Sequence, residues 1–169
     1  MINYEIVQHP TERSYYLDHS STQKQSKSGA IYTQFYNTKD FSDYNTVIYG
    51  HNMLNGTMFG QLKKYKSKEF FDSHREIYVY MPNRVLKYTV FAAYLWNDDH
   101  LLLNFDFEDP MVRSSYWNQI LAQHNMNGII ADDVLVTADD RVITLSTCSS
   151  RDDQRYLVQA VLTYDSDEE

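Results

Sequence analysis

Ile143-Thr144-Leu145-Ser146-Thr147-Cys148 predicts a β-strand that ends on the only cysteine of this chain. Branched and apolar side chains across 141–147 favour extended structure. The polar segment 149–155 follows, and a second apolar run at 156–162 predicts the next strand. The pattern therefore places a thiol where a strand opens into a polar loop.

A thiol in this position has two possible roles, as a nucleophile or as a buried structural residue. Arg155 stands at the far end of the loop, and a nearby guanidinium favours the thiolate, which is the nucleophilic form. The alternative is a small buried hydrophobic residue, which is the commoner role for a lone cysteine at the end of an apolar strand.

A second stretch favours the nucleophile. Asn45-Thr46-Val47-Ile48-Tyr49-Gly50-His51-Asn52-Met53 predicts another strand, which ends in glycine and presents a histidine. Histidine is the usual general acid and base beside a nucleophilic thiol.

Together these stretches resemble the sortase family, the cysteine transpeptidases of Gram-positive bacterial surfaces. Thr144–Cys148 is similar to the family's TLxTC signature, and Arg155 opens the following strand as the family arginine does. Gly50-His51-Asn52-Met53, followed by Asn55-Gly56-Thr57-Met58-Phe59, is similar to the histidine segment of class B sortases. Ile2–Gln8 is close to the family's first-strand pattern, so the resemblance extends through nearly the whole chain.

The expected fold is mainly β with helices. Fifteen tyrosines and 15% aromatic residues suit a half-buried sheet better than a helical bundle. The resemblance implies a sortase-like closed β-barrel of about eight strands, with short helices and a long helix before the cysteine strand. At 169 residues we expect one catalytic domain, 1–169.

The long helix is the clearest one in the sequence. Asp109-Pro110 predicts its start, and Met111, Trp117, Ile120, Leu121 and His124 fall near helical spacing on one face. Asn127-Gly128 predicts its end. We expect Trp117 to pack in the core.

Other elements are shorter. Strands are expected at 76–81 and 85–96, split by a turn at Pro82-Asn83, and two short helices at 58–62 and 67–71. The acidic segment 165–169 is expected to be solvated and mobile. His74 and His100 stand in polar company and are poor candidates for a catalytic base.

The formal net charge of −8 disfavours nucleic acid as a partner. No run of about twenty apolar residues occurs. The resemblance implies an N-terminal membrane anchor and a leading helix, which we expect to lie outside this sequence, and a location on the extracellular face of the bacterial membrane.

The resemblance also implies the roles of the site residues. Cys148 attacks a backbone carbonyl, His51 protonates the leaving amine, and Arg155 binds substrate and stabilises the oxyanion, with Arg151 as the alternative arginine. Ser146, Tyr49 and Thr147 are expected to bind substrate; a strand serine and a packed tyrosine are the alternatives. Ser149 stands where an acidic residue is frequent in this class.

The implied function is a cysteine transpeptidase. It would cleave a C-terminal sorting signal after threonine through a thioester, and transfer the protein to an amine of a peptidoglycan precursor or a pilin. The alternatives are a thiol hydrolase and a peptide-binding domain without turnover. No Cys-x-x-Cys or His-Glu-x-x-His spacing is present, and we expect neither a metal nor another cofactor.

Overall fold

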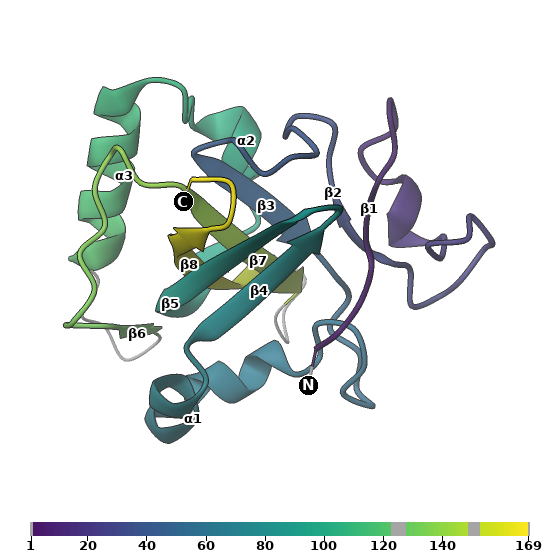
Figure 1. Cartoon of the computed structure of the whole chain (residues 1–169). Helices are drawn as coiled ribbons and strands as arrows, with labels where there is room; N and C mark the ends of the chain where they lie inside the picture. Colours follow the sequence, from purple (N-terminus) through teal and green to yellow (C-terminus); the bar gives the residue numbers. More distant parts are fainter. Residues whose placement is uncertain (1, 123–127, 149–152, 169) are drawn as a thin grey trace.

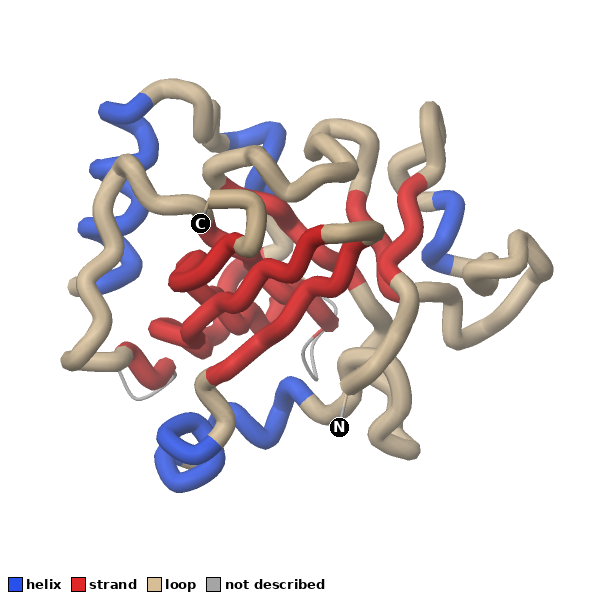
Figure 2. The backbone as a smooth tube through the Cα atoms, in the orientation of Figure 1, coloured by secondary structure: helices blue, strands red, loops and turns tan. Residues whose placement is uncertain are grey.

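The computed structural model describes residues 2–122, 128–148 and 153–168. In these ranges strands form one central sheet, with helices and loops around it (Figures 1 and 2). The strands are β1 (Ile6–Gln8), β2 (Ile31–Thr33), β3 (Asn45–Tyr49), β4 (Glu76–Met81), β5 (Arg84–Asn97), β6 (Gly128–Ile130), β7 (Val142–Cys148) and β8 (Gln154–Asp165). The helical segments are η1 (Tyr15–Leu17), η2 (Leu62–Lys66), α1 (Lys68–Ser73), α2 (Leu101–Asn104) and α3 (Pro110–Leu121).

The strand order agrees with the predicted mainly β fold of about eight strands. Strands are hydrogen-bonded in the order β1-β2-β3-β7-β8-β5-β4, and β6 pairs with β5. The β1–β2 and β3–β7 pairs are parallel, and the other pairs are antiparallel. Within the described residues this path ends at β1 on one side and at β4 on the other.

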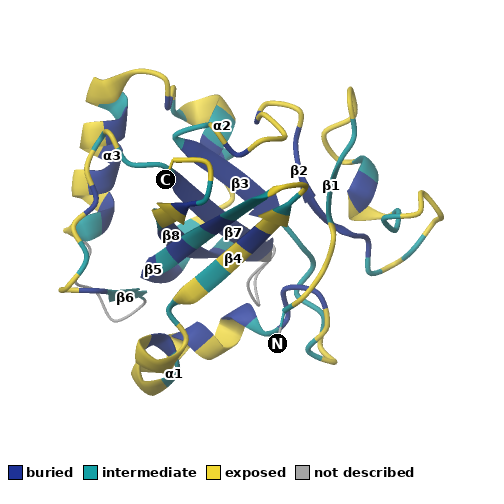
Figure 3. Cartoon of the chain, viewed as in Figure 1, coloured by how far each residue is buried: buried dark blue, intermediate teal, exposed yellow. Residues whose placement is uncertain are grey.

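The core lies on the three central strands β5, β7 and β8. Their fully buried side chains include Val90, Phe91, Ile143, Val158 and Ala160, and Figure 3 shows the strands dark blue where they are covered. Long β5 and β8 pair along most of their lengths. Burial of this apolar surface makes the β7–β8 pair a firm support for the residues at its end.

Helix α3 begins as predicted. The Asp109 side chain accepts a hydrogen bond from the Met111 backbone N–H at 2.8 Å, and proline occupies the first turn. Trp117 is 1% exposed, which confirms its core role. Met111 is 77% exposed, so its predicted place on the buried face is wrong. At about 100° per residue Met111 lies about 180° around the helix from the fully buried Ile120, so it points to solvent.

The predicted end of this helix is also wrong. Helix α3 ends at Leu121, and Gly128 pairs with Tyr94 in the β5–β6 ladder. An added Cβ at Gly128 would lie 2.8 Å from the Tyr94 Cβ, so close strand approach explains this glycine. His124 and Asn127 lie outside the described residues. No helix in the described ranges is both long and apolar enough for a membrane span.

Between His51 and β5, some of the predicted turns and helices are confirmed and one is wrong. The Pro82-Asn83 turn joins β4 to β5, with Asn83 at φ 62°. Ser67 caps α1 as predicted. The predicted helix at 58–62 is wrong, because Met58 has φ 52° and bridges to Asn52, which excludes a helical start.

The prediction of a solvated acidic end holds for Asp167 and Glu168, whose side chains are 58% and 66% exposed, but not for Asp165. Asp165 is 5% exposed and accepts hydrogen bonds from Arg84 and Arg141. Arg141 also donates to Glu168 at 2.6 Å, and the Ser166 N–H donates to the Val85 carbonyl. Two arginines from separate parts of the sheet converge here, which the local acidic composition did not indicate.

Candidate active site

The strand register brings the predicted catalytic residues to one edge of the sheet. Cys148 and Arg155 are direct partners in the antiparallel β7–β8 ladder. Tyr49 is the partner of Ser146 in the parallel β3–β7 ladder, and His51 and Cys148 each come two residues later. Because β3 and β7 are parallel, both end at the same edge, where β8 begins.

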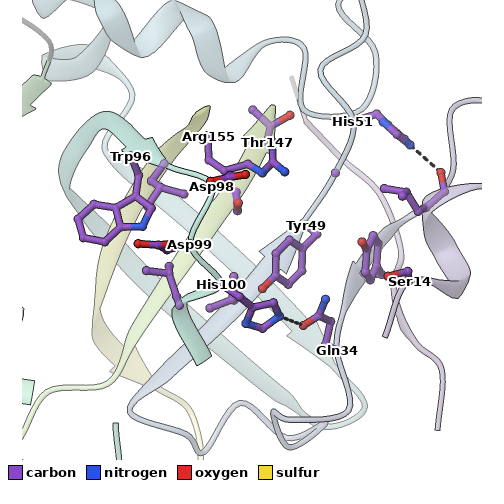
Figure 4. A pocket seen from close by; sticks show the side chains of 17 residues that line it. Ser14, Gln34, Tyr49, His51, Trp96, Asp98, Asp99, His100, Thr147 and Arg155 are labelled. Carbon is purple, nitrogen blue, oxygen red and sulfur yellow. Dashed lines mark hydrogen bonds between the residues drawn. The ribbon is translucent and has the colours of Figure 1, made fainter. Parts of the chain in front are cut away.

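A pocket of about 220 Å³ opens at this edge (Figure 4). Five predicted site residues line it: His51, Arg155, Tyr49, Ser146 and Thr147. In the view of Figure 4, His51 lies on one side of the pocket and Arg155 on the other. The structure thus gathers the predicted residues, while their catalytic and binding roles stay predictions.

His51 is held at three points. The N–H of the preceding Gly50 donates to the Ser146 carbonyl at 3.2 Å, and the Phe59 N–H donates to the His51 carbonyl at 2.9 Å. The ring Nε2 lies 2.6 Å from the carbonyl oxygen of Leu17. A carbonyl oxygen only accepts hydrogen bonds, so Nε2 carries the proton in this contact.

Gly50 allows this tight strand end. An added Cβ would lie 2.5 Å from the Ile31 side chain and 2.8 Å from the Phe59 ring. The glycine before His51 is therefore explained by close packing, which fixes the backbone from which the histidine projects.

Tyr49 is the last residue of β3, two residues before His51. Its ring stacks on Tyr32 with centroids 5.4 Å apart. Burial raises the pKa of Tyr49 well above its ordinary value, with a smaller contribution from Tyr32, so the phenol stays neutral. Ser146 and Thr147 are 5% and 4% exposed, and in the described residues the Thr147 Oγ1 has no hydrogen-bond partner.

The pocket includes residues that the sequence analysis missed. They come from η1 and the residue before it, from the end of β5, and from the segment after β5: Ser14, Leu17, Trp96, Asp98, Asp99 and His100. The β5–β8 register explains part of this, because Trp96 is the partner of Arg155. Only strand pairing brings the end of β5 to the start of β8, so no local signal could have shown it.

His100 is the most informative of these residues. Its Nε2 lies 2.5 Å from the Gln34 Oε1, and its Nδ1 is buried without a partner in the described part of the chain. Burial lowers the pKa of His100 below its ordinary value, and Arg13 lowers it further. In its neutral form His100 donates a hydrogen bond from Nε2 to Gln34, and its ring lines the pocket.

Two sequence predictions cannot be placed, because Arg151 and Ser149 lie outside the described residues. Within the described ranges, no three His, Cys, Asp or Glu side chains gather as a metal-binding cluster.

Comparison with known proteins identifies the family. The family model described as "Sortase domain" matches residues 2–163. Sortase B of Listeria monocytogenes serovar 1/2a is 32% identical over 152 residues, which cover 90% of this chain and 60% of that protein. The chain therefore spans about three fifths of the length of this curated relative.

Solved structures agree in fold. Sortase B from Listeria monocytogenes is 31% identical, with a TM-score of 0.79 and coverage of 94% of this chain and 86% of that one. Sortase B of Clostridium perfringens is 27% identical, with a TM-score of 0.83 and coverage of 95% and 87%. A sortase B–substrate complex from Staphylococcus aureus is 29% identical, with a TM-score of 0.79 and coverage of 95% and 74%.

These likenesses bear out the predicted sortase-like architecture. The family model spans residues 2–163, which include His51, Cys148 and Arg155. The chain belongs to the sortase family, and within it to the class B sortases.

Proposed function

We propose that this protein is a cysteine transpeptidase that cleaves a sorting signal after threonine and joins the released acyl group to an amine. The observation that carries the proposal is the meeting of three strand ends. Cys148 and Arg155 are ladder partners, and His51 follows the strand that runs parallel beside Cys148.

In this proposal Cys148 is the nucleophile. A free thiol, with a reference pKa of about 8.5, is only a few per cent thiolate at neutral pH. The guanidinium of Arg155 and a protonated His51 both favour the thiolate. Attack on the peptide carbonyl forms a C–S bond and a tetrahedral oxyanion, which Arg155 stabilises.

His51 handles the proton. It donates a proton to the leaving amine as the C–N bond breaks, which leaves a thioester on Cys148. An incoming amine then attacks the thioester carbonyl, His51 takes the proton from that amine, and the thiolate leaves. The cycle returns both residues to their starting forms, so no cofactor is consumed.

The substrate would be an extended peptide in the pocket beside Arg155. Tyr49, Ser146 and Thr147 offer hydroxyl groups along its wall. The Staphylococcus aureus relative is described as a complex with substrate, which supports peptide binding in this fold. The acceptor would be an amine of a peptidoglycan precursor or a pilin, reached from the outer face of the membrane.

The test is cleavage of a panel of quenched fluorescent peptides with Asn-Pro-x-Thr-type signals, with and without triglycine as the amine. Cys148→Ala is the negative control. Cleavage that depends on Cys148, with triglycine joined to the threonine carboxyl group, supports transpeptidation. Cleavage that gives only the free acid supports a thiol hydrolase instead.

Absence of cleavage with every peptide, together with a Cys148 that does not react with iodoacetamide, would contradict the enzymatic proposal. Peptide binding without turnover would then favour the binding domain.

A further inference from the structure

The ring of His51 is bound to a segment that lies far from it in the sequence. Its Nε2 is 2.6 Å from the carbonyl oxygen of Leu17, 34 residues earlier. This is the hydrogen bond drawn at His51 in Figure 4, and Leu17 belongs to the wall of the same pocket. The contact fixes which ring nitrogen carries the resting proton.

The Leu17 carbonyl is held by the fold rather than by a flexible loop. The Leu17 N–H donates to the Ser14 carbonyl at 3.0 Å, which closes the η1 turn. The Ala30 N–H donates to the Tyr16 carbonyl at 2.9 Å, and Tyr16 is 5% exposed. Since Ala30 directly precedes β2, and β2 pairs with β3, the acceptor and the histidine are attached to the same sheet.

Gly29 makes room for this carbonyl. It has φ +59°, and an added Cβ would lie 2.5 Å from the Tyr16 carbonyl oxygen and 2.7 Å from the Leu17 carbonyl oxygen. Both neighbours are backbone atoms, so a side chain here would displace the η1 carbonyls. The position of the Leu17 acceptor therefore depends on a glycine at 29.

We propose that the Leu17 backbone carbonyl keeps His51 protonated at Nε2, that the proton exchanged with substrate is carried on Nδ1, and that Gly29 is a positioning residue for this arrangement. The proposal rests on the transpeptidase function proposed above.

The proton balance follows from this assignment. In the imidazolium form both ring nitrogens carry protons, and Nδ1 releases its proton to the leaving amine as the C–N bond breaks. The neutral ring keeps the Nε2 proton because Leu17 still accepts it. Nδ1 then has the lone pair that takes a proton from the incoming amine. The opposite tautomer would set the Nε2 lone pair against a carbonyl oxygen, which is repulsive.

The first measurement is the tautomer of His51 in the wild-type protein. Ring ¹⁵N chemical shifts, assigned with His51→Gln, report which nitrogen of the neutral ring is protonated. We expect the Nε2–H form. An Nδ1–H form would overturn the proposal, and this readout needs no peptide substrate, so it stands even if the proposed function fails.

The second measurement compares Gly29→Ala with Gly56→Ala. Gly56 also has positive φ, but an added Cβ there meets only the Gln61 Cγ, at 4.0 Å. Gly29→Ala should lower kcat by about 10–100-fold, as expected for a displaced catalytic group, with a smaller change in KM for the peptide. In Gly29→Ala, the ring ¹⁵N shifts of His51 should no longer show only the Nε2–H form. Gly56→Ala should keep the wild-type kcat and the wild-type ¹⁵N shifts of His51.

An unchanged or raised kcat in folded Gly29→Ala, with the wild-type His51 signature, would overturn the proposal. If Gly29→Ala does not fold, Nδ-methylhistidine at position 51 provides the decision. This residue blocks Nδ1, and its neutral ring has a lone pair and no proton on Nε2, so it also cannot donate to Leu17; we expect peptide cleavage to be lost. Wild-type turnover by the methylated enzyme would contradict the use of Nδ1.

Discussion

Arg155 faces Cys148 across the β7–β8 ladder, and its planar fork is the property that lysine cannot reproduce. A guanidinium donates two parallel hydrogen bonds, whereas an ammonium acts as a compact charge. Arg155→Lys keeps the charge and removes this geometry. We therefore expect kcat for peptide cleavage to fall by about 10²–10³-fold, as for loss of an oxyanion donor.

Steady-state kinetics with the best peptide of the panel measures this effect. Arg75→Lys is a matched control, because Arg75 pairs with Asp133 and does not line the pocket. A kcat for Arg155→Lys equal to that of the control would exclude a geometric role for the guanidinium.

His100 predicts a pH effect on stability. Burial lowers its pKa in the folded state below the ordinary value of 6.5, so the unfolded chain binds the proton more readily. The stability that the neutral His100 gives to the folded protein is fully present above pH 6.5 and is lost progressively as the pH falls below that value. In urea denaturation from pH 8 to pH 5, His100→Gln should lose less stability than wild type. Parallel pH profiles for the two proteins would show that His100 has no part in the acid response.

Among the elements, the end of β8 is held by an ion-pair network. Asp165 accepts from Arg84 at the start of β5 and from Arg141 just before β7. Hydrogen bonding to Arg84 holds the pKa of the Asp165 carboxyl well below its usual range. The carboxylate therefore contributes stability at all pH values above its ordinary pKa, and this contribution is lost only on strong acidification.

Asp165→Asn should lower the free energy of unfolding at pH 7 by about 3 kcal/mol. This is the lower end of the effect of breaking a buried pair, because both arginines keep some exposure. Urea denaturation measures the change. The exposed Asp132→Asn is the control and should stay within about 0.5 kcal/mol of wild type. Equal midpoints for the two variants would contradict this role of the network.

At the scale of the whole molecule, a buried polar network joins the sheet to helix α3. The Gln159 amide donates to the Thr144 hydroxyl at 3.0 Å and to the Tyr116 hydroxyl at 3.2 Å. The Tyr94 hydroxyl donates to the side-chain Oε1 of Gln159 at 2.9 Å, and the Thr144 hydroxyl in turn donates to the Asn45 Oδ1 on β3. Strands β3, β5, β7 and β8 are thus tied to α3 by side chains with little or no exposure.

Gln159→Leu should destabilise the protein by about 1–3 kcal/mol, because it leaves buried hydroxyl groups without partners. Gln119→Leu, the same change on the exposed side of α3, is the control and should have little effect. Thermal unfolding of the two variants, followed by circular dichroism, compares them. Equal Tm values would mean that the hydroxyl groups find other partners.

The sequence by itself determined the local elements and the identity of the candidate catalytic residues. Alternating apolar residues before Cys148 predicted β7, and the Asp109-Pro110 cap predicted the start of α3, because both depend on neighbours within a few residues. The motifs around His51 and Cys148 likewise needed only short spacings.

Only the tertiary structure decided which distant segments meet. It placed the Leu17 carbonyl on His51, His100 in the pocket, and two arginines on Asp165, which had been expected to be solvated. The partners in these contacts are separated by 24 to 81 residues in the chain. Such contacts depend on strand pairing and on burial of the common core, and neither can be predicted from a short stretch of sequence.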